Sequence, residues 1–337
     1  MTSTRPINEQ VVVITGASSG IGRETALQFA RVGASIVLAA RNDKALDEVK
    51  QEVERLGGKA HVVVTDTAEW EQVSQLADEA EKNFGRIDTW VNNSSVSQYA
   101  AVEEMTVEEI DRVIRVNLMG QIHGMKAALP VMRRQGRGTI INVASVLAAR
   151  SVPLQSAYCA AKHGIKGFTE ALRLELEHEK SGINVTLILP SSINTPLFNH
   201  ARSKLGVTPM PIPPVYEPRV VAESILFAAE HPRRDIVVGG AGKLMIIAER
   251  ISPALLDRFM LHKGQMWKKQ KTDKPDNGQD NLDQPMIETG STTGDFGEKS
   301  KSVSLYTRHL EQYPNRKRLL AGAVLVAAAT LMRQAKR

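Results

Sequence analysis

A run of β-branched residues followed by a glycine-rich turn constrains the fold of this chain more than any other feature. Residues 11–14 read Val-Val-Val-Ile, which is typical of a strand buried on both faces of a parallel sheet. Residues 15–22 follow with the spacing Gly-x-x-x-Gly-x-Gly, and a helical pattern then runs to Arg31. Glycines at this point let the backbone approach a pyrophosphate, which rests on the N-terminus of the helix. The pattern predicts the first unit of an α/β domain with a phosphate site.

Strand and helix patterns alternate along the next two hundred residues. Apolar runs that read as strands are separated by charged, amphipathic stretches that read as helices, and right-handed crossovers would place all the strands in one sheet. We therefore expect an α/β fold with a single doubly wound parallel sheet of the Rossmann type and a C-terminal helical and disordered extension. The expected strands cover residues 11–14, 35–40, 60–64, 89–92, 139–143, 184–189 and 235–238, and the expected helices 24–31, 44–56, 69–83, 106–134, 156–180 and 220–230.

Three residues in the middle of the chain point to proton-transfer chemistry. Tyr158 and Lys162 are four positions apart, so on a helix their side chains lie on one face. A free phenol has a pKa of about 10 and exchanges protons poorly at neutral pH, whereas a cation beside it favours the phenolate. Ser145 follows an expected strand, and its hydroxyl can hydrogen-bond the same reacting oxygen. The three residues predict a site that moves a proton to or from an alcohol or carbonyl oxygen.

Residues 10–240 resemble the short-chain dehydrogenase/reductase family, because several of its motifs occur here in the same order. The glycine turn is similar to the family's cofactor turn, and Asn92-Asn93-Ser94-Ser95 stands where the family usually has Asn-Asn-Ala-Gly. Residues 190–195 are similar to its loop at the end of a strand. The chain departs from the family pattern at Ser95 and Ser191, where glycine is usual. Neither change touches a group that moves a proton.

The resemblance implies four catalytic residues and an oxidoreductase that interconverts a carbonyl and an alcohol by hydride transfer. Tyr158 would be the general acid and base. Lys162 would lower the pKa of the phenol and bind the nicotinamide ribose, and Ser145 would position the substrate oxygen. Asn117 would hold a water molecule beside Lys162 as a proton relay. The cofactor-binding residues that the resemblance implies are Gly16, Ser18, Ser19, Gly20, Ile21, Gly22, Arg41, Asp66, Asn92, Ser94, Tyr158, Lys162, Pro190, Ile193 and Thr195.

The end of the second strand favours NADP(H) over NAD(H). A carboxylate there would accept hydrogen bonds from the adenosine ribose and repel a 2′-phosphate. The chain instead reads Ala39-Ala40-Arg41-Asn42, with a guanidinium available for the phosphate. The alternative is that Arg41 is a solvated residue at a strand end. Asp66 resembles the family's adenine-contacting aspartate, and a loop-capping role is the alternative.

Two other functions stay open from the sequence. One is a non-catalytic NADP-binding sensor or scaffold on the same fold. The other is a relative that modifies an acyl chain or a sugar by epimerase or lyase chemistry. The presence of Asn117, Ser145, Tyr158 and Lys162 together argues against a scaffold, which has no need of all four.

Composition changes divide the chain into four parts. We expect a dehydrogenase/reductase domain at 1–242, a helical extension at 243–267, a disordered polar linker at 268–304 and a basic tail at 305–337. A proline-rich insertion at 196–218 interrupts the alternation at the carboxyl ends of the strands, which predicts a substrate lid, and an ordinary surface loop is the alternative. Its apolar residues indicate a lipophilic substrate. The family is commonly oligomeric, and the resemblance implies a homo-oligomer formed through the helices at 106–134 and 156–180.

The net charge of +6 lies in the tail. Residues 303–337 contain seven Lys and Arg and one Glu, and the remaining charges balance at 36 against 36. A neutral body does not support nucleic-acid binding. The single cysteine, Cys159, excludes an internal disulfide and fits a reducing compartment. The eight histidines show no metal-ligand spacing, so no metal site is expected.

Residues 319–332 form an apolar stretch with basic residues on both sides. A helix of these fourteen residues would be about 21 Å long, which is less than the roughly 30 Å of a hydrocarbon core. Basic side chains can reach the interface, and bilayers thin locally. We expect membrane contact as a C-terminal tether, with the enzyme on the cytoplasmic side. The alternative is a helix that docks on the domain or on a partner subunit.

Overall fold

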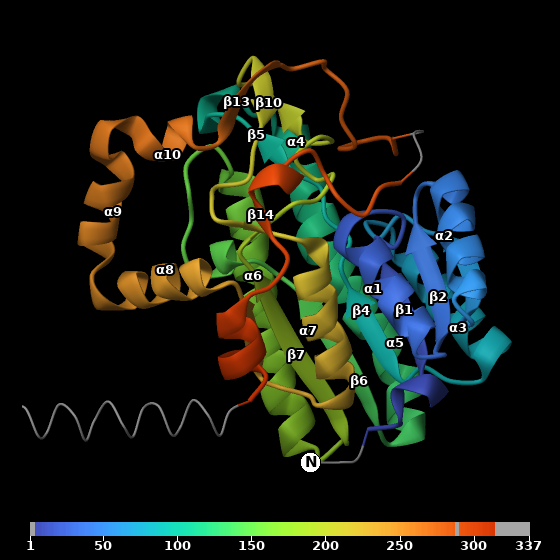
Figure 1. The fold of residues 1–337 in the computed structure, drawn as a ribbon. Helices are drawn as coiled ribbons and strands as arrows, with labels where there is room; N and C mark the ends of the chain where they lie inside the picture. Colours follow the sequence, from blue (N-terminus) through green and yellow to red (C-terminus); the bar gives the residue numbers. More distant parts are fainter. Residues whose placement is uncertain (1–3, 287–289, 314–337) are drawn as a thin grey trace, which may run out of the picture.

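Seven parallel strands form the central sheet (Figure 1). The structure, a computed structural model, describes residues 4–286 and 290–313. The strand order is β12-β7-β6-β4-β1-β2-β3, and every neighbouring pair is parallel. This arrangement confirms the Rossmann-type sheet that the sequence predicts. The strands are β1 Val11–Thr15, β2 Ser35–Ala40, β3 Lys59–Val64, β4 Thr89–Asn92, β6 Gly138–Val143, β7 Ile183–Pro190 and β12 Asp235–Val238.

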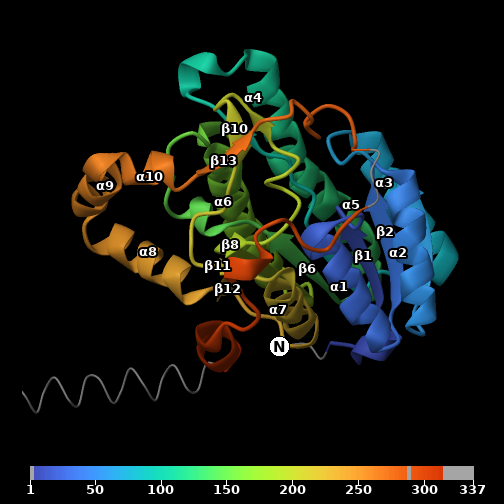
Figure 2. The same ribbon diagram turned by 45° about the horizontal axis from the view of Figure 1, so that its top comes forward.

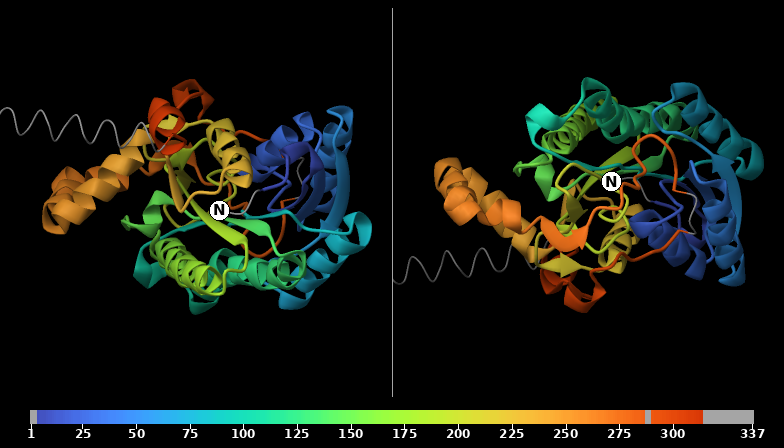
Figure 3. Two further views of the ribbon diagram at one scale, coloured as in Figure 1. Left: turned by 90° about the horizontal axis from the view of Figure 1, so that it is seen from below. Right: turned by 90° about the horizontal axis from the view of Figure 1, so that it is seen from above.

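Helices cover both faces of this sheet, as Figure 3 shows. Apolar side chains of α1, α2 and α7 pack on one face, and those of α3, α5 and α6 pack on the other. The β-branched residues of β1 are fully buried between these layers, which explains why the strand has no polar face. The helices are α1 Gly20–Arg31, α2 Asp43–Arg55, α3 Trp70–Phe84, α5 Gly120–Gln135, α6 Ser156–His178 and α7 Pro218–Glu230.

The helix that the sequence predicts over 106–134 is interrupted. Helix α4, Val107–Ile114, starts at a capping box formed by Thr106 and Glu109. A π-helical turn, Arg115–Met119, then connects it to α5. Single π-turns inside helices occur frequently at functional sites, and this one contains Asn117.

An arm projects from the domain after β12, at the left of Figures 1 and 2. We call residues 240–268 the arm; it comprises α8 Gly240–Ile251, α9 Pro253–Leu261 and α10 Gln265–Lys268. The sequence predicts a helical extension here, and the structure breaks it at Ser252, because Pro253 begins a new helix. Arg150 fastens the arm to the domain through ion pairs with Glu249 of α8 and Asp257 of α9.

The expectation of a disordered linker at 268–304 is wrong, because the described residues of this range pack on the domain. Strand β13, Lys271–Pro275, pairs with β10, Val207–Pro209, and β14, Ser300–Lys301, pairs with β11, Val215–Tyr216. The segment is poor in apolar residues, so composition predicts no core. Its order instead comes from backbone pairing, ion pairs and one anchor, Leu282, which is fully buried.

The apolar stretch 319–332 lies outside the described residues, so its contact with a membrane stays a prediction. Among residues 4–286 and 290–313, no helix combines the length and apolar character needed to cross a membrane.

Candidate active site

The carboxyl ends of the parallel strands bring most of the predicted site residues to one edge of the sheet. The order of the strands reverses between β1 and β4, which is where ligands of such sheets bind. The glycine turn follows β1, Arg41 follows β2, Asp66 follows β3 and Ser145 follows β6. The loop after β7 contributes Thr195.

The glycine turn is packed too closely for any other residue at two positions. Gly16 has a φ of +67° and lies against Asn93 and Ser94, so a side chain there would be strained. A Cβ on Gly22 would lie 2.1 Å from the carbonyl oxygen of Gly16. These contacts hold the start of α1 against the end of β1, with the first N–H groups of the helix turned toward the edge of the sheet.

Helix α6 places Tyr158 and Lys162 on one buried face, as their spacing predicts. The Lys162 Nζ lies 5.3 Å from the centre of the Tyr158 ring and donates a hydrogen bond of 3.1 Å to the carbonyl oxygen of Val143. The Ser145 hydroxyl accepts a hydrogen bond of 3.1 Å from the backbone N–H of Leu147, which fixes its direction at the end of β6. All three side chains line the same cavity.

Burial shifts the pKa values of this site in the direction of the neutral forms. Burial raises the pKa of Tyr158 above its usual range, while the hydroxyls of Ser145 and Ser95 oppose that rise. Burial also lowers the pKa of Lys162 to about 7. In the protein without ligands, burial therefore favours the neutral phenol of Tyr158 and makes the Lys162 ammonium easier to deprotonate.

Two adjoining cavities open at this edge of the sheet. One, of about 500 Å³, contains Ser145, Tyr158 and Lys162. The other, of about 170 Å³, lies over the glycine turn, Arg41 and Asp66. Five residues line both cavities: Ile21, Asn93, Ser95, Thr195 and Leu197. A ligand bound over the glycine turn could therefore reach a second molecule held beside Tyr158.

Known proteins share both the sequence pattern and this architecture. Residues 10–206 match the family model for short chain dehydrogenases, which is more than half of the chain. The uncharacterized oxidoreductase YxnA of Bacillus subtilis (strain 168) is 38% identical over 330 residues, covering 96% of this chain and 92% of that protein. The chain belongs to the short-chain dehydrogenase family. It is therefore an enzyme of the oxidoreductase class.

Solved structures of similar proteins agree with this family assignment. A short-chain dehydrogenase/reductase of Burkholderia phymatum in complex with NAD has a TM-score of 0.69 and 26% identity, covering 75% of this chain and 97% of that one. An alcohol dehydrogenase of the archaeon Thermococcus sibiricus complexed with 5-hydroxy-NADP has a TM-score of 0.59 and 25% identity, covering 68% of this chain and 95% of that one.

Asn117 of this short-chain dehydrogenase is fully buried at the π-turn. Its side-chain oxygen accepts from the backbone N–H of Val96 at 2.8 Å, and its amide donates to the Val96 carbonyl at 2.8 Å. Asn117 thus holds the loop after β4 in place. The proton-relay role implied by the family stays a prediction.

Asn92 is a predicted cofactor residue whose side chain the structure does not bring to either cavity. It is fully buried in the sheet, where it accepts from the Trp90 indole at 2.8 Å and donates to Asn142 at 2.9 Å. The reason is the alternation of side chains along a strand, which turns Asn92 away from the edge that Asn93 and Ser94 reach.

The two departures from the family pattern have different surroundings. The Ser95 hydroxyl is buried where the two cavities meet, near the Tyr158 phenol. The Ser191 hydroxyl lies against the backbone of Gly239 and Gly242, whose lack of side chains leaves room for it. Serine is thus accommodated at both positions without displacing the glycine turn.

Arg41 and Asp66 line the smaller cavity as the sequence predicts, but both have protein partners. Arg41 donates to the backbone carbonyls of residues 281–283. Asp66 forms an ion pair with Arg112, with 2.6 Å between Oδ2 and the guanidinium. Sequence reasoning missed Arg112 and the segment near residue 282, because neither lies in a recognisable motif. Among the described residues, no cluster of three or more His, Cys, Asp and Glu side chains could hold a metal ion.

Proposed function

We propose that this short-chain dehydrogenase is an NADP(H)-dependent oxidoreductase that interconverts a carbonyl and an alcohol, with Tyr158 as general acid and base. One observation carries the proposal: Ser145, Tyr158 and Lys162 line a 500 Å³ cavity that adjoins the glycine turn. That is the arrangement required for a bound dinucleotide to meet a small substrate beside a proton donor.

The residues of the site have distinct tasks in this reaction. The nicotinamide ring, when bound, supplies or accepts the hydride. Tyr158 gives its proton to the substrate oxygen during reduction and takes it back during oxidation. The Ser145 hydroxyl hydrogen-bonds the same oxygen and stabilises negative charge on it. Lys162, as a cation, favours the phenolate form of Tyr158 and offers donors to the ribose.

We propose a lipophilic substrate because the walls of the larger cavity are mostly apolar. The 196–218 insertion and the arm, which lie on either side of α7 and β12 in the sequence, supply these walls. No carboxylate lines the cavity among the described residues, so nothing there would repel an anionic end group. The apolar wall residues from the insertion and the arm are Leu197, Phe198, Met210, Ile212, Leu244, Met245, Leu256, Phe259, Met260 and Met266.

The glycine turn suits a pyrophosphate, because Gly16 and Gly22 allow the turn and the start of α1 to pack closely together, and this packing places the N-terminus of α1 at the edge of the sheet. We expect NADPH to be preferred over NADH, because the residue directly after β2 is Arg41, whose guanidinium can bind a 2′-phosphate, and not a carboxylate. Replacing Arg41 with Ala should lower the ratio of kcat/KM for NADPH over NADH about tenfold. The measurement is initial-rate kinetics by NAD(P)H absorbance against a panel of ketones, aldehydes and quinones.

The same panel separates the competing functions. Arg55→Ala is the matched control, because Arg55 is exposed on α2, lines neither cavity and, within the described part of the chain, hydrogen-bonds only to Gln51. A wild-type preference for NADH would refute the cofactor proposal. Binding of NADPH without turnover of any panel compound would favour the sensor or scaffold function instead.

We further propose that residues 319–332 tether the enzyme to a membrane. Full-length protein is then expected in the membrane fraction after a high-salt wash, and protein that ends at Tyr313 in the soluble fraction. The shorter chain keeps the turn Thr307–Glu311, whose Thr307 packs on β12, so the domain stays complete. Equal solubility of both proteins would make the segment a protein-docking element.

A further inference from the structure

A segment of the chain's own C-terminal part lies over the cofactor end of the site. We call the described residues 280–286 and 290–291 the strap. Figures 1 and 2 show this orange segment crossing the edge of the sheet where the strands end. Four strap residues, Asn281, Pro285, Met286 and Gly290, line the smaller cavity.

Carbonyl oxygens of the strap accept hydrogen bonds from groups that could otherwise donate to a dinucleotide. The backbone N–H of Gly20, at the N-terminus of α1, donates to the Ser291 carbonyl at 2.8 Å. Arg41 donates to the Asp283 carbonyl at 2.9 Å and to the Asn281 carbonyl at 2.5 Å. Arg23, in the first turn of α1, donates to the Gly290 carbonyl. The strap thus offers acceptors at the same places as phosphate oxygens would.

The space that remains under the strap is too small for a dinucleotide. The cavity over the glycine turn measures about 170 Å³, whereas sites for drug-sized ligands have about 300–1,000 Å³. A Cβ on Gly290 would lie 1.9 Å from the Ser18 carbonyl oxygen. The strap is therefore in direct contact with the turn that the sequence assigns to the pyrophosphate.

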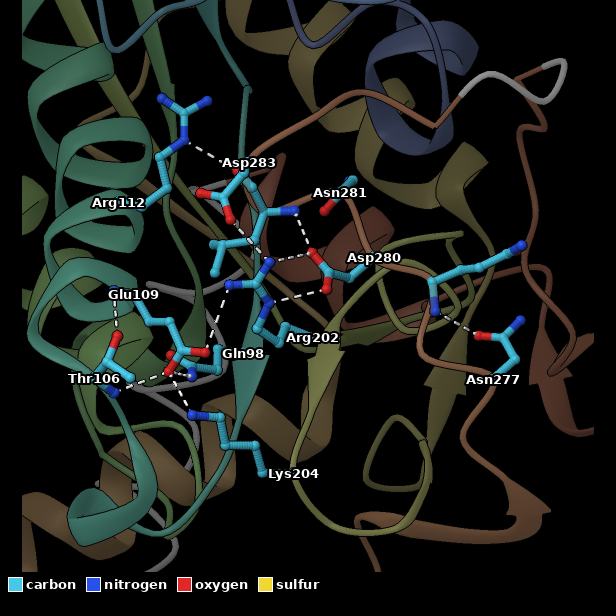
Figure 4. A network of polar contacts seen from close by, with 12 residues as sticks. Gln98, Thr106, Glu109, Arg112, Arg202, Lys204, Asn277, Asp280, Asn281 and Asp283 are labelled. Carbon is cyan, nitrogen blue, oxygen red and sulfur yellow. Dashed lines mark hydrogen bonds and ion pairs between the residues drawn. The ribbon is translucent and has the colours of Figure 1, made fainter.

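Ion pairs remote from the cofactor donors hold the strap closed. Arg202, on β9 Arg202–Ser203, lies between the strap and α4, as Figure 4 shows. Its guanidinium binds Asp280 at 2.9 Å and Asp283 at 2.8 Å. Glu109 faces the same guanidinium at 3.5 Å and also binds Lys204 at 2.8 Å. Between Asp280 and Asp283 in the sequence, the side chain of Leu282 is fully buried and also anchors the strap.

We propose that the strap competes with the dinucleotide, so that the Arg202–Asp280 pair is a determinant of cofactor affinity. The cofactor binds only when the strap has left the cleft, and the apparent affinity is reduced by the fraction of chains that are open. Charged phosphate oxygens accept hydrogen bonds more strongly than neutral carbonyls, so a bound cofactor keeps the strap displaced. This inference rests on the proposed nicotinamide-dependent function.

Weakening the strap at its ion pair should therefore tighten cofactor binding. Asp280→Asn removes the charge that pairs with Arg202 but keeps the oxygen that accepts from the Leu282 N–H. A partly exposed pair of this kind is worth about fivefold in an equilibrium constant. We expect the Kd of NADPH, measured by fluorescence titration of the full chain, to fall about fivefold.

Matched variants test whether the fall in Kd comes from loss of the Arg202–Asp280 ion pair. Asp273→Asn makes the same chemical change on exposed β13, where Asp273 has no ion pair among the described residues, and should leave the Kd unchanged. Arg202→Gln removes the ion pairs with both Asp280 and Asp283, so it should lower the Kd at least as much as Asp280→Asn, and the double variant should gain less than the sum of the two. Agreement of the two single variants also guards against a folding defect in either one.

Hydrogen exchange of the strap gives an independent readout. Its backbone amides should exchange faster when saturating NADPH is added, since the strap leaves the cleft. Slower exchange with NADPH, or weaker NADPH binding by Asp280→Asn, would overturn the proposal by showing that the strap holds the cofactor in place. An unchanged Kd for Asp280→Asn would also overturn it. Failure of wild type and variants alike to bind NADPH or NADH would instead refute the proposed function on which the inference rests.

Discussion

Replacing Tyr158 with phenylalanine is expected to lower kcat by about three orders of magnitude while cofactor affinity stays near the wild-type value. In the proposed mechanism the phenol gives its proton to the substrate oxygen, and a positioned general acid contributes about 10²–10⁴-fold. The ring itself remains and keeps its packing beside Lys162. The loss should therefore appear in turnover rather than in folding or binding. Steady-state kinetics and NADPH titration of the same preparation measure both quantities.

Tyr216→Phe is the matched control for this change. Tyr216 is also buried, on β11, and lines neither cavity. Its variant should keep wild-type kcat. Wild-type activity of the Tyr158 variant on a verified substrate would show that another group moves the proton and would end the proposed mechanism.

Replacing Lys162 with methionine is expected to stabilise the cofactor-free protein while it impairs the reaction. The side chain of Lys162 is only 1% exposed, and burial lowers its pKa to about 7. Keeping a cation in this place costs free energy that an apolar chain of similar length does not. Methionine also loses the hydrogen bond to Val143, which offsets part of the gain. A net gain on the order of 2 kcal/mol in the free energy of unfolding is expected near pH 6.

The gain should depend on pH with a defined sign. Below about pH 7 the lysine is protonated in the folded and unfolded states, so the folded protein bears the full cost of the buried charge. Between this pH and the pKa of a free lysine, about 10.4, the folded state sheds its proton and wild-type stability rises. The advantage of the variant should therefore shrink from pH 6 to pH 9, as measured by urea unfolding.

Lys82→Met controls for the general effect of removing a lysine. Lys82 is 74% exposed on α3, so its replacement should change stability little at either pH. A Lys162 variant that is less stable than wild type at both pH values would contradict the assignment of a destabilising buried cation.

The parts of the site that depend on local spacing could be predicted from the sequence. The four-residue spacing of Tyr158 and Lys162 gives one helical face, and β-branched residues followed by glycines give the turn after β1. The parallel sheet then brings distant strand ends together, so Ser145 and Asp66 could be placed at the same edge. These inferences hold because each rests on backbone geometry that few other contacts can alter.

The remaining features depend on long-range contacts that no local pattern encodes. Asn92 has the right motif, but the pleat of β4 turns its side chain into the sheet. The sequence around Leu282 predicts disorder because it contains few apolar residues. Its order depends on ion pairs with distant residues, such as Arg202–Asp280, which composition does not reveal. The π-turn at Asn117 follows from packing of α4 and α5 on different neighbours. Arg41 donates hydrogen bonds to carbonyl oxygens of the strap, whereas the sequence predicted either solvent or a phosphate group as its partner.

The ion pairs of Arg150 belong to a part of the molecule with an excess of basic residues. The arm has five Lys and Arg residues and two acidic residues, and Arg150 pairs with both acids, so the arm together with Arg150 has a net charge of +4, from six basic and two acidic side chains. Among the described residues, the charged side chains that line the larger cavity are Lys162 and Lys269, so a positive potential is expected at its mouth, with a range of about 8 Å in physiological salt. An apolar molecule that ends in an anionic group would be drawn to this mouth by the field and then retained by its hydrocarbon part.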